Sequence, residues 1–209
     1  YFTITDPYFP SALTESYPRA IGGIINSENN LLSVSIEVWD VDGGIILSAY
    51  SDVLPLNTKT YDLSKLDNQL HLNLLKPGNY IFDIYIDFWD DIDSDYKTFT
   101  LTVNPASFSS TNIGYPTSIT QGRGFPVTGT VRSTGNITKV WVGAYSSSTA
   151  APDSYIVGAS ETISVFSYVQ GYNLANLDSK VVFNNLSKGT YYYKVMVELS
   201  SGTRYTYIN

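Results

Sequence analysis

An acidic segment near the middle of the chain carries the residues best suited to binding a metal ion. Asp91, Asp93 and Asp95 stand at alternate positions within residues 89–96, the spacing of the first three ligands in calcium-binding loops. The rest of such a loop is missing, because Tyr96 stands where a Gly is needed and no Glu follows at the twelfth position. We expect a solvated hairpin turn and no cofactor, with a Ca²⁺ site as the alternative.

Aromatic side chains that point away from the core form a second candidate site. Trp141 and Tyr145 are out of phase with the apolar residues of their predicted strand, and Tyr192 and Met196 have the same outward phase on a later strand. The two strands are neighbours in the fold predicted below, so the four side chains are expected to form one exposed patch. Such a patch could stack on a cell-wall or host glycan, or anchor another surface protein. The alternative is that they only stabilise cross-strand pairs.

Residue types that usually catalyse reactions are scarce. The chain has no Cys, which excludes disulfides, thiol catalysis and cysteine metal sites. Its one histidine, His71, aligns with Val182 in the internal repeat described below and has no Ser-Asp partners to complete a triad. Phosphate-loop, nucleophile-elbow and zinc-protease motifs are missing from the sequence. The sequence therefore predicts that the protein is not an enzyme.

Charge is divided unevenly along the chain. Residues 1–104 contain 15 acidic and 5 basic side chains, a balance of −10, whereas residues 105–209 contain 4 acidic and 7 basic ones, a balance of +3. The acidic half would repel nucleic acid and anionic membranes, and the basic half has no dense Lys/Arg cluster. We expect neither partner, no membrane insertion, and a weak head-to-tail attraction between molecules.

The elements that must position these residues have the periodicity of β-strands. In four segments, every second residue is apolar and the residues between are of mixed type. The segments are 34–38, 80–88, 140–144 and 191–199. This pattern is typical of antiparallel strands with one buried face. Asp42-Gly43 lies between two apolar runs and predicts a hairpin turn. Helical periodicity is limited to short turns around residues 63–70 and 174–181. About seven strands per 100 residues predicts an all-β chain of immunoglobulin-like sandwiches.

The sequence repeats itself once. Residues 2–39 align with residues 108–145 at an offset of 106, and residues 61–86 align with residues 172–197 at an offset of 111. The second copy therefore has five additional residues between these blocks. A period near 105 residues is a whole domain, so we expect one sandwich over residues 1–104 and another over residues 105–209. The short linker around Pro105 is expected to be stiff.

Each copy ends its repeated stretch with the pattern Leu-x-x-Gly-x-Tyr. Gly78 and Tyr80 carry it in the first copy, and Gly189 and Tyr191 in the second. The pattern resembles the tyrosine corner of immunoglobulin-like folds, in which the Tyr hydroxyl bonds back to the backbone before a strand.

The polar pairs Asp67/Asp178 and Asn73/Asn184 recur in the same repeated stretch. They are interpreted as turn residues that bond the local backbone.

The amino-acid sequence of the repeat also resembles that of bacterial immunoglobulin-like modules. These modules are appended to secreted cell-wall hydrolases and surface proteins of Gram-positive bacteria. The motifs that carry the resemblance are Tyr-Pro-Thr-Ser-Ile at 115–119, Gly-Thr-Val-x-Ser at 129–133, Tyr-Asn-Leu-x-x-Leu-Asp at 172–178 and Leu-x-x-Gly-Thr-Tyr at 186–191. The second copy matches over nearly its full length, and the first is more divergent. The resemblance implies the fold and an extracellular location, and it brings no active site with it.

These observations favour a non-catalytic spacer, stalk or adhesion segment of a larger secreted or cell-surface protein. A carbohydrate-binding module that uses the outward aromatic residues is the alternative. No basic stretch followed by an apolar one stands at the N-terminus, so this sequence is not expected to include a secretory signal.

Overall fold

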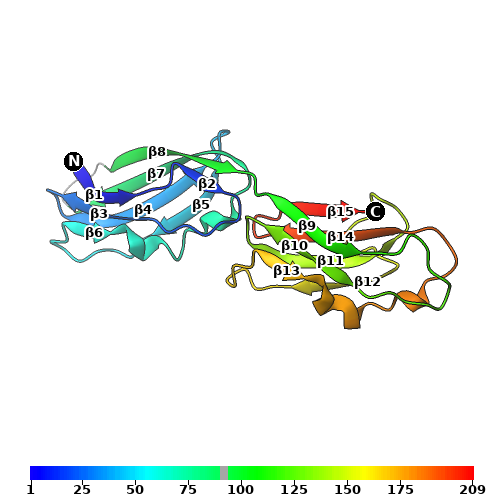
Figure 1. The fold of residues 1–209 in the computed structure, drawn as a ribbon. Helices are drawn as coiled ribbons and strands as arrows, with labels where there is room; N and C mark the ends of the chain where they lie inside the picture. Colours follow the sequence, from blue (N-terminus) through cyan, green and yellow to red (C-terminus); the bar gives the residue numbers. More distant parts are fainter. Residues whose placement is uncertain (90–93) are drawn as a thin grey trace. The chain divides into compact units, whose positions relative to one another are not determined.

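The computed structural model describes residues 1–89 and 94–209, and the chain is built from β-strands (Figure 1). It divides into two compact units, Tyr1–Pro105 and Ala106–Asn209. The boundary lies one residue from the one expected from the repeat.

The first unit consists of two facing sheets. One sheet has the order β1-β3-β6 and the other the order β2-β8-β7-β4-β5. Between β6 and β7 the chain forms two short 3₁₀ helices, η1 and η2. The bounds are β1 Phe2–Tyr8, β2 Ala12–Thr14, β3 Gly22–Ser27, β4 Leu31–Trp39, β5 Ile45–Tyr50, β6 Thr60–Asp62, η1 Leu63–Leu66, η2 Leu72–Leu74, β7 Gly78–Phe88 and β8 Asp95–Asn104.

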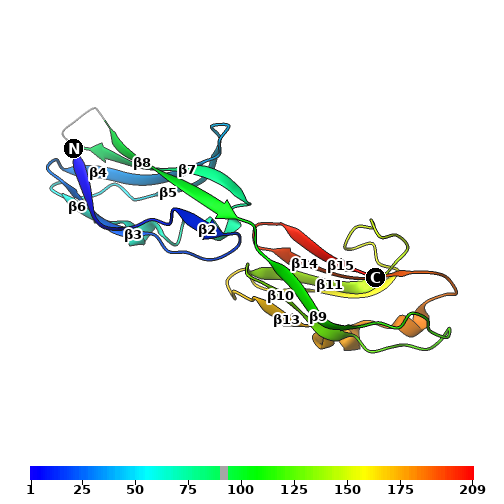
Figure 2. The same ribbon diagram turned by 45° about the horizontal axis from the view of Figure 1, so that its top comes forward.

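The second unit repeats this plan with one strand fewer. Its sheets have the orders β13-β10-β9 and β12-β11-β14-β15, and 3₁₀ helices η3 and η4 again follow the short edge strand (Figure 2). The bounds are β9 Phe108–Gly114, β10 Thr128–Ser133, β11 Ile137–Tyr145, β12 Val157–Thr162, β13 Gly171–Asn173, η3 Leu174–Lys180, η4 Phe183–Asn185, β14 Tyr192–Leu199 and β15 Arg204–Ile208.

The strand order identifies both units as immunoglobulin-like sandwiches, as predicted. In the letters of that fold, strands A, B and E form the smaller sheet, and C′, C, F and G form the larger one. The first unit departs from the expected antiparallel pairing at one place. Its β2 pairs in parallel with the end of β8, where Leu13 lies opposite Val103.

Each unit has its own core because the inward faces of its central strands are apolar. On β4, Val34, Ile36 and Val38 are fully buried and alternate with half-buried side chains. On β11, Val140 and Val142 are fully buried and pair with apolar residues of β14. Buried residues from both sheets of a unit meet in one apolar cluster, so burial of these strand faces stabilises each sandwich separately.

A β-bulge with an unusual backbone recurs at the same place in both units. Asp6 and Asn112, which are 106 positions apart, have φ values of 49° and 54°, and the opposing Gly23 and Gly129 have φ values of 130° and 113°. The strand register shifts at this point in both β1–β3 and β9–β10. A Cβ on Gly129 would lie 2.7 Å from Ile113 Cδ1 and 2.9 Å from the Asn112 oxygen. Glycine is therefore required there for space as well as for φ.

The repeated stretch begins with a capped 3₁₀ helix. The side chains of Asp62 and Asn173 accept hydrogen bonds from the backbone nitrogens of Ser64 (3.0 Å) and Ala175 (3.1 Å). Asx side chains are favourable at such caps because they satisfy a backbone donor at the start of the helix. The caps direct the leucines of η1 and η3 inward, and all four of them are buried. These are Leu63 and Leu66 in the first unit, and Leu174 and Leu177 in the second.

The second acidic residue of the stretch links distant parts of each unit. Asp67 Oδ1 accepts a hydrogen bond from the backbone nitrogen of Ile21 (2.9 Å), and Asp178 Oδ1 accepts one from Val127 (2.6 Å). The interpretation of these aspartates as local turn residues is therefore wrong. Ile21 and Val127 are almost completely buried just before β3 and β10. Their N–H groups would lack an acceptor without these carboxylates, and an unpaired buried donor is costly.

The tyrosine corner has the expected hydrogen bond in both units. Tyr80 Oη donates to the Lys76 carbonyl oxygen at 2.9 Å, and Tyr191 Oη donates to the Ser187 carbonyl oxygen at 3.0 Å. Both rings are half-buried and pack against the core of their unit. Gly78 and Gly189 lie beside these rings, and a Cβ on Gly189 would stand 3.2 Å from Tyr191 Oη. The corner thus fixes how the chain enters β7 and β14.

We predict that Gly129→Ala destabilises the second unit by about 3 kcal/mol or more, because a clash with backbone adds to the conformational penalty. Gly122→Ala is the matched control. Gly122 also has a positive φ, 79°, but nothing lies within 4 Å of its Cβ position, so it should cost only about 1–2 kcal/mol. Denaturant unfolding measures both, and equal losses would contradict the steric role of the bulge.

We further predict that Asp178→Ala costs about 1–3 kcal/mol of unfolding free energy, because it leaves the Val127 N–H without an acceptor. Asp178→Asn keeps an acceptor oxygen and should lose clearly less. Urea unfolding of the three proteins compares them. An Asp178→Asn variant as unstable as Asp178→Ala would show that the hydrogen bond to Val127 is unimportant.

Candidate functional site

The structure brings the four outward residues of the second unit together as the phase of the strands predicts. Trp141 lies opposite Met196, and Tyr145 lies opposite Tyr192, across the β11–β14 ladder. Trp141, Tyr145 and Met196 form a small cluster with Ala150 and Tyr155 that is separate from the sandwich core. The expected exposure is wrong for these three, which are only 1%, 0% and 3% exposed. Only Tyr192, at 40%, is accessible.

The connection between β11 and β12, residues 146–156, covers this cluster. Trp141 Nε1 donates to Asp153 Oδ1 (2.7 Å), and Tyr145 Oη donates to the Pro152 carbonyl oxygen (2.6 Å). The Tyr155 ring meets Tyr145 edge-on, with 6.2 Å between ring centroids. The polar atoms of both large aromatic residues are thus satisfied by this connection, as buried Trp and Tyr require.

Two lysines complete the covered cluster. Lys194 is 2% exposed, donates to the Ala150 carbonyl oxygen at 2.7 Å and lies 4.7 Å from the centre of the Tyr145 ring. Lys139 Nζ lies 4.6 Å from the centre of the Trp141 ring. Burial lowers the pKa of Lys194 and raises that of Tyr145. The charge of Lys194 is therefore balanced by a carbonyl dipole and an aromatic face.

The longer connection of the second unit, residues 146–156 against residues 40–44 in the first unit, explains why the patch is closed. In the first unit, the same two strands are joined by a tight turn in which Asp40 Oδ1 accepts hydrogen bonds from the Asp42 and Gly44 nitrogens. The longer connection of the second unit folds back over the sheet instead. Close approach is possible because Gly143 and Gly158 face each other, and a Cβ on Gly143 would lie 3.1 Å from that of Tyr155.

The proposed calcium ligands lie mostly beyond the described part of the chain. Asp91 and Asp93 fall within residues 90–93, which the structure does not describe. Asp95 begins β8, where its carboxylate accepts a hydrogen bond from Tyr96 N and lies 3.7 Å from the Tyr1 amino group. No group of three His, Cys, Asp or Glu side chains that could hold a metal occurs in residues 1–89 and 94–209. The calcium site stays a prediction.

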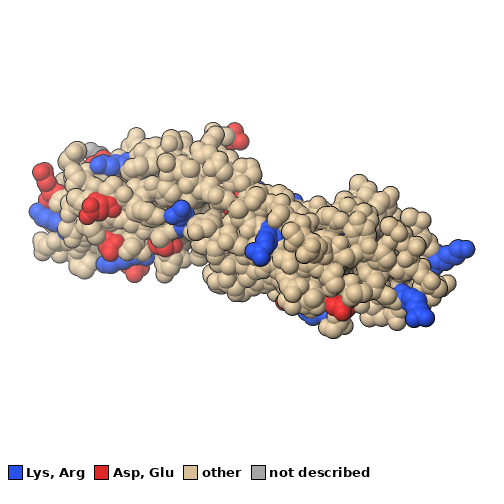
Figure 3. All heavy atoms as spheres, viewed as in Figure 1, with Lys and Arg blue, Asp and Glu red and all other residues tan. Residues whose placement is uncertain are grey.

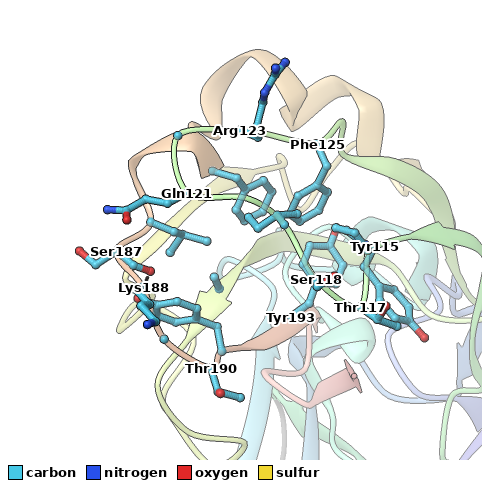
Figure 4. A pocket seen from close by; sticks show the side chains of 18 residues that line it. Tyr115, Thr117, Ser118, Gln121, Arg123, Phe125, Ser187, Lys188, Thr190 and Tyr193 are labelled. Atoms are coloured by element: carbon cyan, nitrogen blue, oxygen red, sulfur yellow. Dashed lines mark hydrogen bonds between the residues drawn. The ribbon is translucent and has the colours of Figure 1, made fainter.

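A cleft of about 430 Å³ lies in the second unit between residues 115–125 and residues 183–193 (Figure 4). Aromatic rings form its base. Phe125 and Phe183 stack with ring centroids 4.2 Å apart, and Tyr193 lies 5.8 Å from Phe125 and 5.9 Å from Tyr115. The cleft is therefore lined by large apolar surfaces that are already well packed against one another.

Polar groups surround the aromatic base. Arg123, Lys188 and Gln121 line the cleft near its rim, and Figure 4 shows the Arg123 side chain pointing away from it. At the base, the Tyr193 hydroxyl is buried and has no hydrogen-bond partner among the described residues. Burial raises the pKa of Tyr193. A concave site that combines aromatic surface with a few polar groups has the usual form of a binding pocket, so this cleft is the candidate site that the structure adds.

The sequence analysis did not predict this cleft, although two of the motifs that it singled out line it. Tyr-Pro-Thr-Ser-Ile at 115–119 and Leu-x-x-Gly-Thr-Tyr at 186–191 were motifs of the family resemblance. The two motifs are 71 positions apart, from Tyr115 to Leu186. Nothing in their spacing shows that they face each other across an opening.

The acidic residues belong mainly to the first unit, as the count along the chain requires. Figure 3 shows red side chains gathered over that unit and few over the second. Two carboxylates of the second unit form surface pairs, Lys180–Glu161 at 2.9 Å and Arg204–Glu198 at 2.6 Å. Exposed pairs of this kind contribute little to stability.

Comparison by sequence finds no matching protein-family model and no matching curated protein. Among solved structures, the chain is similar to the fibronectin(III)-like modules of CbhA from Clostridium thermocellum, with 12% identity over 100% of this chain and 91% of that one, at a TM-score of 0.29. A TM-score this low supports no argument. The assignment to immunoglobulin-like sandwiches therefore depends on the strand order described above.

We predict that lowering the pH weakens the contact between Asp153 and Trp141. The hydrogen bond from Trp141, and then Lys139, lower the pKa of Asp153 below its ordinary value. Because the folded pKa is the lower one, this stabilisation is present above the unfolded pKa of about 3.9 and is lost as the pH falls through the folded value. The Asp153 side chain is 70% exposed, so the loss should not exceed about 1 kcal/mol.

Trp fluorescence between about pH 5 and pH 2 measures this change. Asp153→Asn should remove a component of the titration that the original chain shows. Identical titration curves for the two proteins would contradict the prediction.

Proposed function

We propose that the chain is a non-catalytic module that acts as a spacer, stalk or adhesion segment of a larger secreted or cell-surface protein. The observation that carries the proposal is the duplication of the same stabilising hydrogen bonds. Asp67 and Asp178 bind the start of strand B, and Tyr80 and Tyr191 close the corner before strand F. The residues that the repeat preserves thus serve the fold of each unit.

The surroundings of His71 and of the outward aromatic residues support the non-catalytic part of the proposal. His71 is exposed beside η2 and is not part of any group of metal-ligating or carboxylate residues in the described ranges. Three of the four candidate residues for sugar binding, Trp141, Tyr145 and Met196, are covered and only Tyr192 is accessible, which weakens the case for the carbohydrate-binding alternative. The proposed extracellular location depends on the resemblance of the repeat to bacterial surface modules.

No helix in the described part of the chain has the length and apolarity needed to cross a membrane.

Pulling single molecules by their ends tests the spacer role. Two units with separate cores should unfold in two events, each lengthening the chain by about 35 nm, since about 100 residues extend by about 3.3–3.6 Å each. Asp178→Ala should lower the force of one event only, and Asp67→Ala that of the other. One event that releases the whole chain would contradict the proposal.

A glycan array of cell-wall and host polysaccharides separates the spacer from a sugar-binding module. We expect no saturable binding by the purified chain. Saturable binding that is lost in a Tyr192→Ala variant but kept in Tyr50→Ala, another exposed tyrosine, would favour the carbohydrate-binding module instead.

A further inference from the structure

The outer face of the larger sheet in the first unit carries two facing carboxylates. Glu37 of β4 lies directly opposite Asp83 of β7 across the ladder. Residues that face each other in this way have Cβ atoms about 5 Å apart, and like charges there destabilise a sheet. In the described part of the chain, neither carboxylate forms an ion pair. Lys97 is the one basic residue in the strands of this sheet, and it has the inward phase, with its amino group over the Phe2 ring.

The hydrogen bonds of the two carboxylates leave one buried oxygen unused. Glu37 Oε1 accepts a hydrogen bond from Tyr50 Oη at 3.1 Å, and Asp83 Oδ2 accepts a long one from Tyr85 Oη at 3.3 Å. Asp83 is only 8% exposed, and its Oδ1 atom is buried with no hydrogen-bond partner among the described residues. A buried carboxylate without a cation is costly. Water can donate to this oxygen, but it cannot neutralise two facing charges.

Aromatic side chains border the carboxylates on the same face. Trp39 is the next outward residue after Glu37 on β4, and its Nε1–H is also buried without a partner among the described residues. Tyr85 is the next outward residue after Asp83 on β7, and its ring centroid lies 5.7 Å from that of Tyr96. The cations of the described chain that lie over aromatic rings are all at other rings. The face therefore combines negative charge with aromatic surface, and both attract a cation.

The second unit shows what this position on the sheet can hold. At the offsets of the repeat, Asp83 corresponds to Lys194 and Trp39 corresponds to Tyr145. The ammonium of Lys194 lies 4.7 Å from the centre of the Tyr145 ring, and the β11–β12 connection covers it. The second unit therefore supplies both a cation for the aromatic face and a peptide segment that covers it. The tight turn between strands C and C′ of the first unit supplies neither.

We propose that the outer face around Glu37, Trp39, Asp83 and Tyr85 is a docking surface for a partner protein, and that it binds an arginine side chain of that partner. A guanidinium group has planar donors that can bridge two carboxylates, and it stacks on aromatic rings. A lysine ammonium matches this arrangement less well. The charge of the face thus selects the partner's chemistry.

The partner's backbone has a role in this contact as well. A carbonyl oxygen of the partner would accept the unused hydrogen bond of Trp39 Nε1–H, as the Pro152 carbonyl oxygen does for Tyr145 Oη in the second unit. The inference goes beyond the proposed function, because a spacer needs no such contact. The pulling experiment tests the spacer role separately.

Titration of the chain with the peptide acetyl-Gly-Arg-Gly-amide, followed by NMR, tests the proposal. We expect saturable shifts of the Trp39 Nε1–H and Asp83 amide signals at low salt, with a Kd of about 1–10 mM for this single side chain. The same peptide with citrulline in place of arginine is the matched control, because it keeps the shape and loses the charge. It should bind at least about tenfold more weakly.

Two variants locate the contact. Asp83→Asn should weaken binding of the arginine peptide by about fivefold or more, because it removes the buried charge. Asp6→Asn removes the same charge from the smaller sheet and should leave binding unchanged. The unfolding midpoint of the first unit should not fall in Asp83→Asn, since the facing charges repel each other. A fall of about 4 °C or more would show that Asp83 serves the fold instead.

Several results would overturn the proposal. They are equal binding of the arginine and citrulline peptides, no saturable shift with either, and an equal loss of binding in Asp83→Asn and Asp6→Asn. A lysine peptide that binds as tightly as the arginine peptide would overturn the choice of arginine. Shifts of the same two signals by Ca²⁺, with no effect of the arginine peptide, would identify a metal site in place of a docking surface.

Discussion

The structure of each unit depends on one hydrogen bond between a carboxylate and a buried backbone amide. The N–H groups of Ile21 and Val127 lie inside the molecule just before strand B. Each is paired with an aspartate, Asp67 directly after η1 and Asp178 within η3. Each 3₁₀ helix is held in place by an Asx cap at its start and by two buried leucines. The cap, the leucines and the carboxylate therefore act together. They fix the 3₁₀ helix that follows strand E to the start of strand B.

Features that recur in both copies could be predicted because duplication marks them. The strand periodicity and the corner tyrosines follow from local rules of strands and turns. The partner of Asp178 could not be predicted in the same way. A carboxylate in a turn has nearby backbone donors in any sequence, and only the folded sheet shows that the donor with no other acceptor lies 51 positions away.

Features that occur in only one copy escaped prediction for a different reason. The phase of β11 correctly places Trp141 and Tyr145 on the outer face, but phase cannot show whether another segment covers that face. The longer connection between β11 and β12 provides the cover, through the hydrogen bonds that Trp141 and Tyr145 donate to Asp153 and Pro152. The repeat therefore predicts the framework better than it predicts the surfaces.

The connection between strands C and C′ has a consequence for how such chains diversify. One unit joins these strands with a tight turn at Asp40–Gly44, and the other with residues 146–156, yet strand C pairs with strand F in the same register in both units. No residue of this connection takes part in the aspartate and tyrosine hydrogen bonds that stabilise each unit. It is accordingly a natural graft point, where inserted peptide can change the outer face of the sheet without disturbing the framework beneath it.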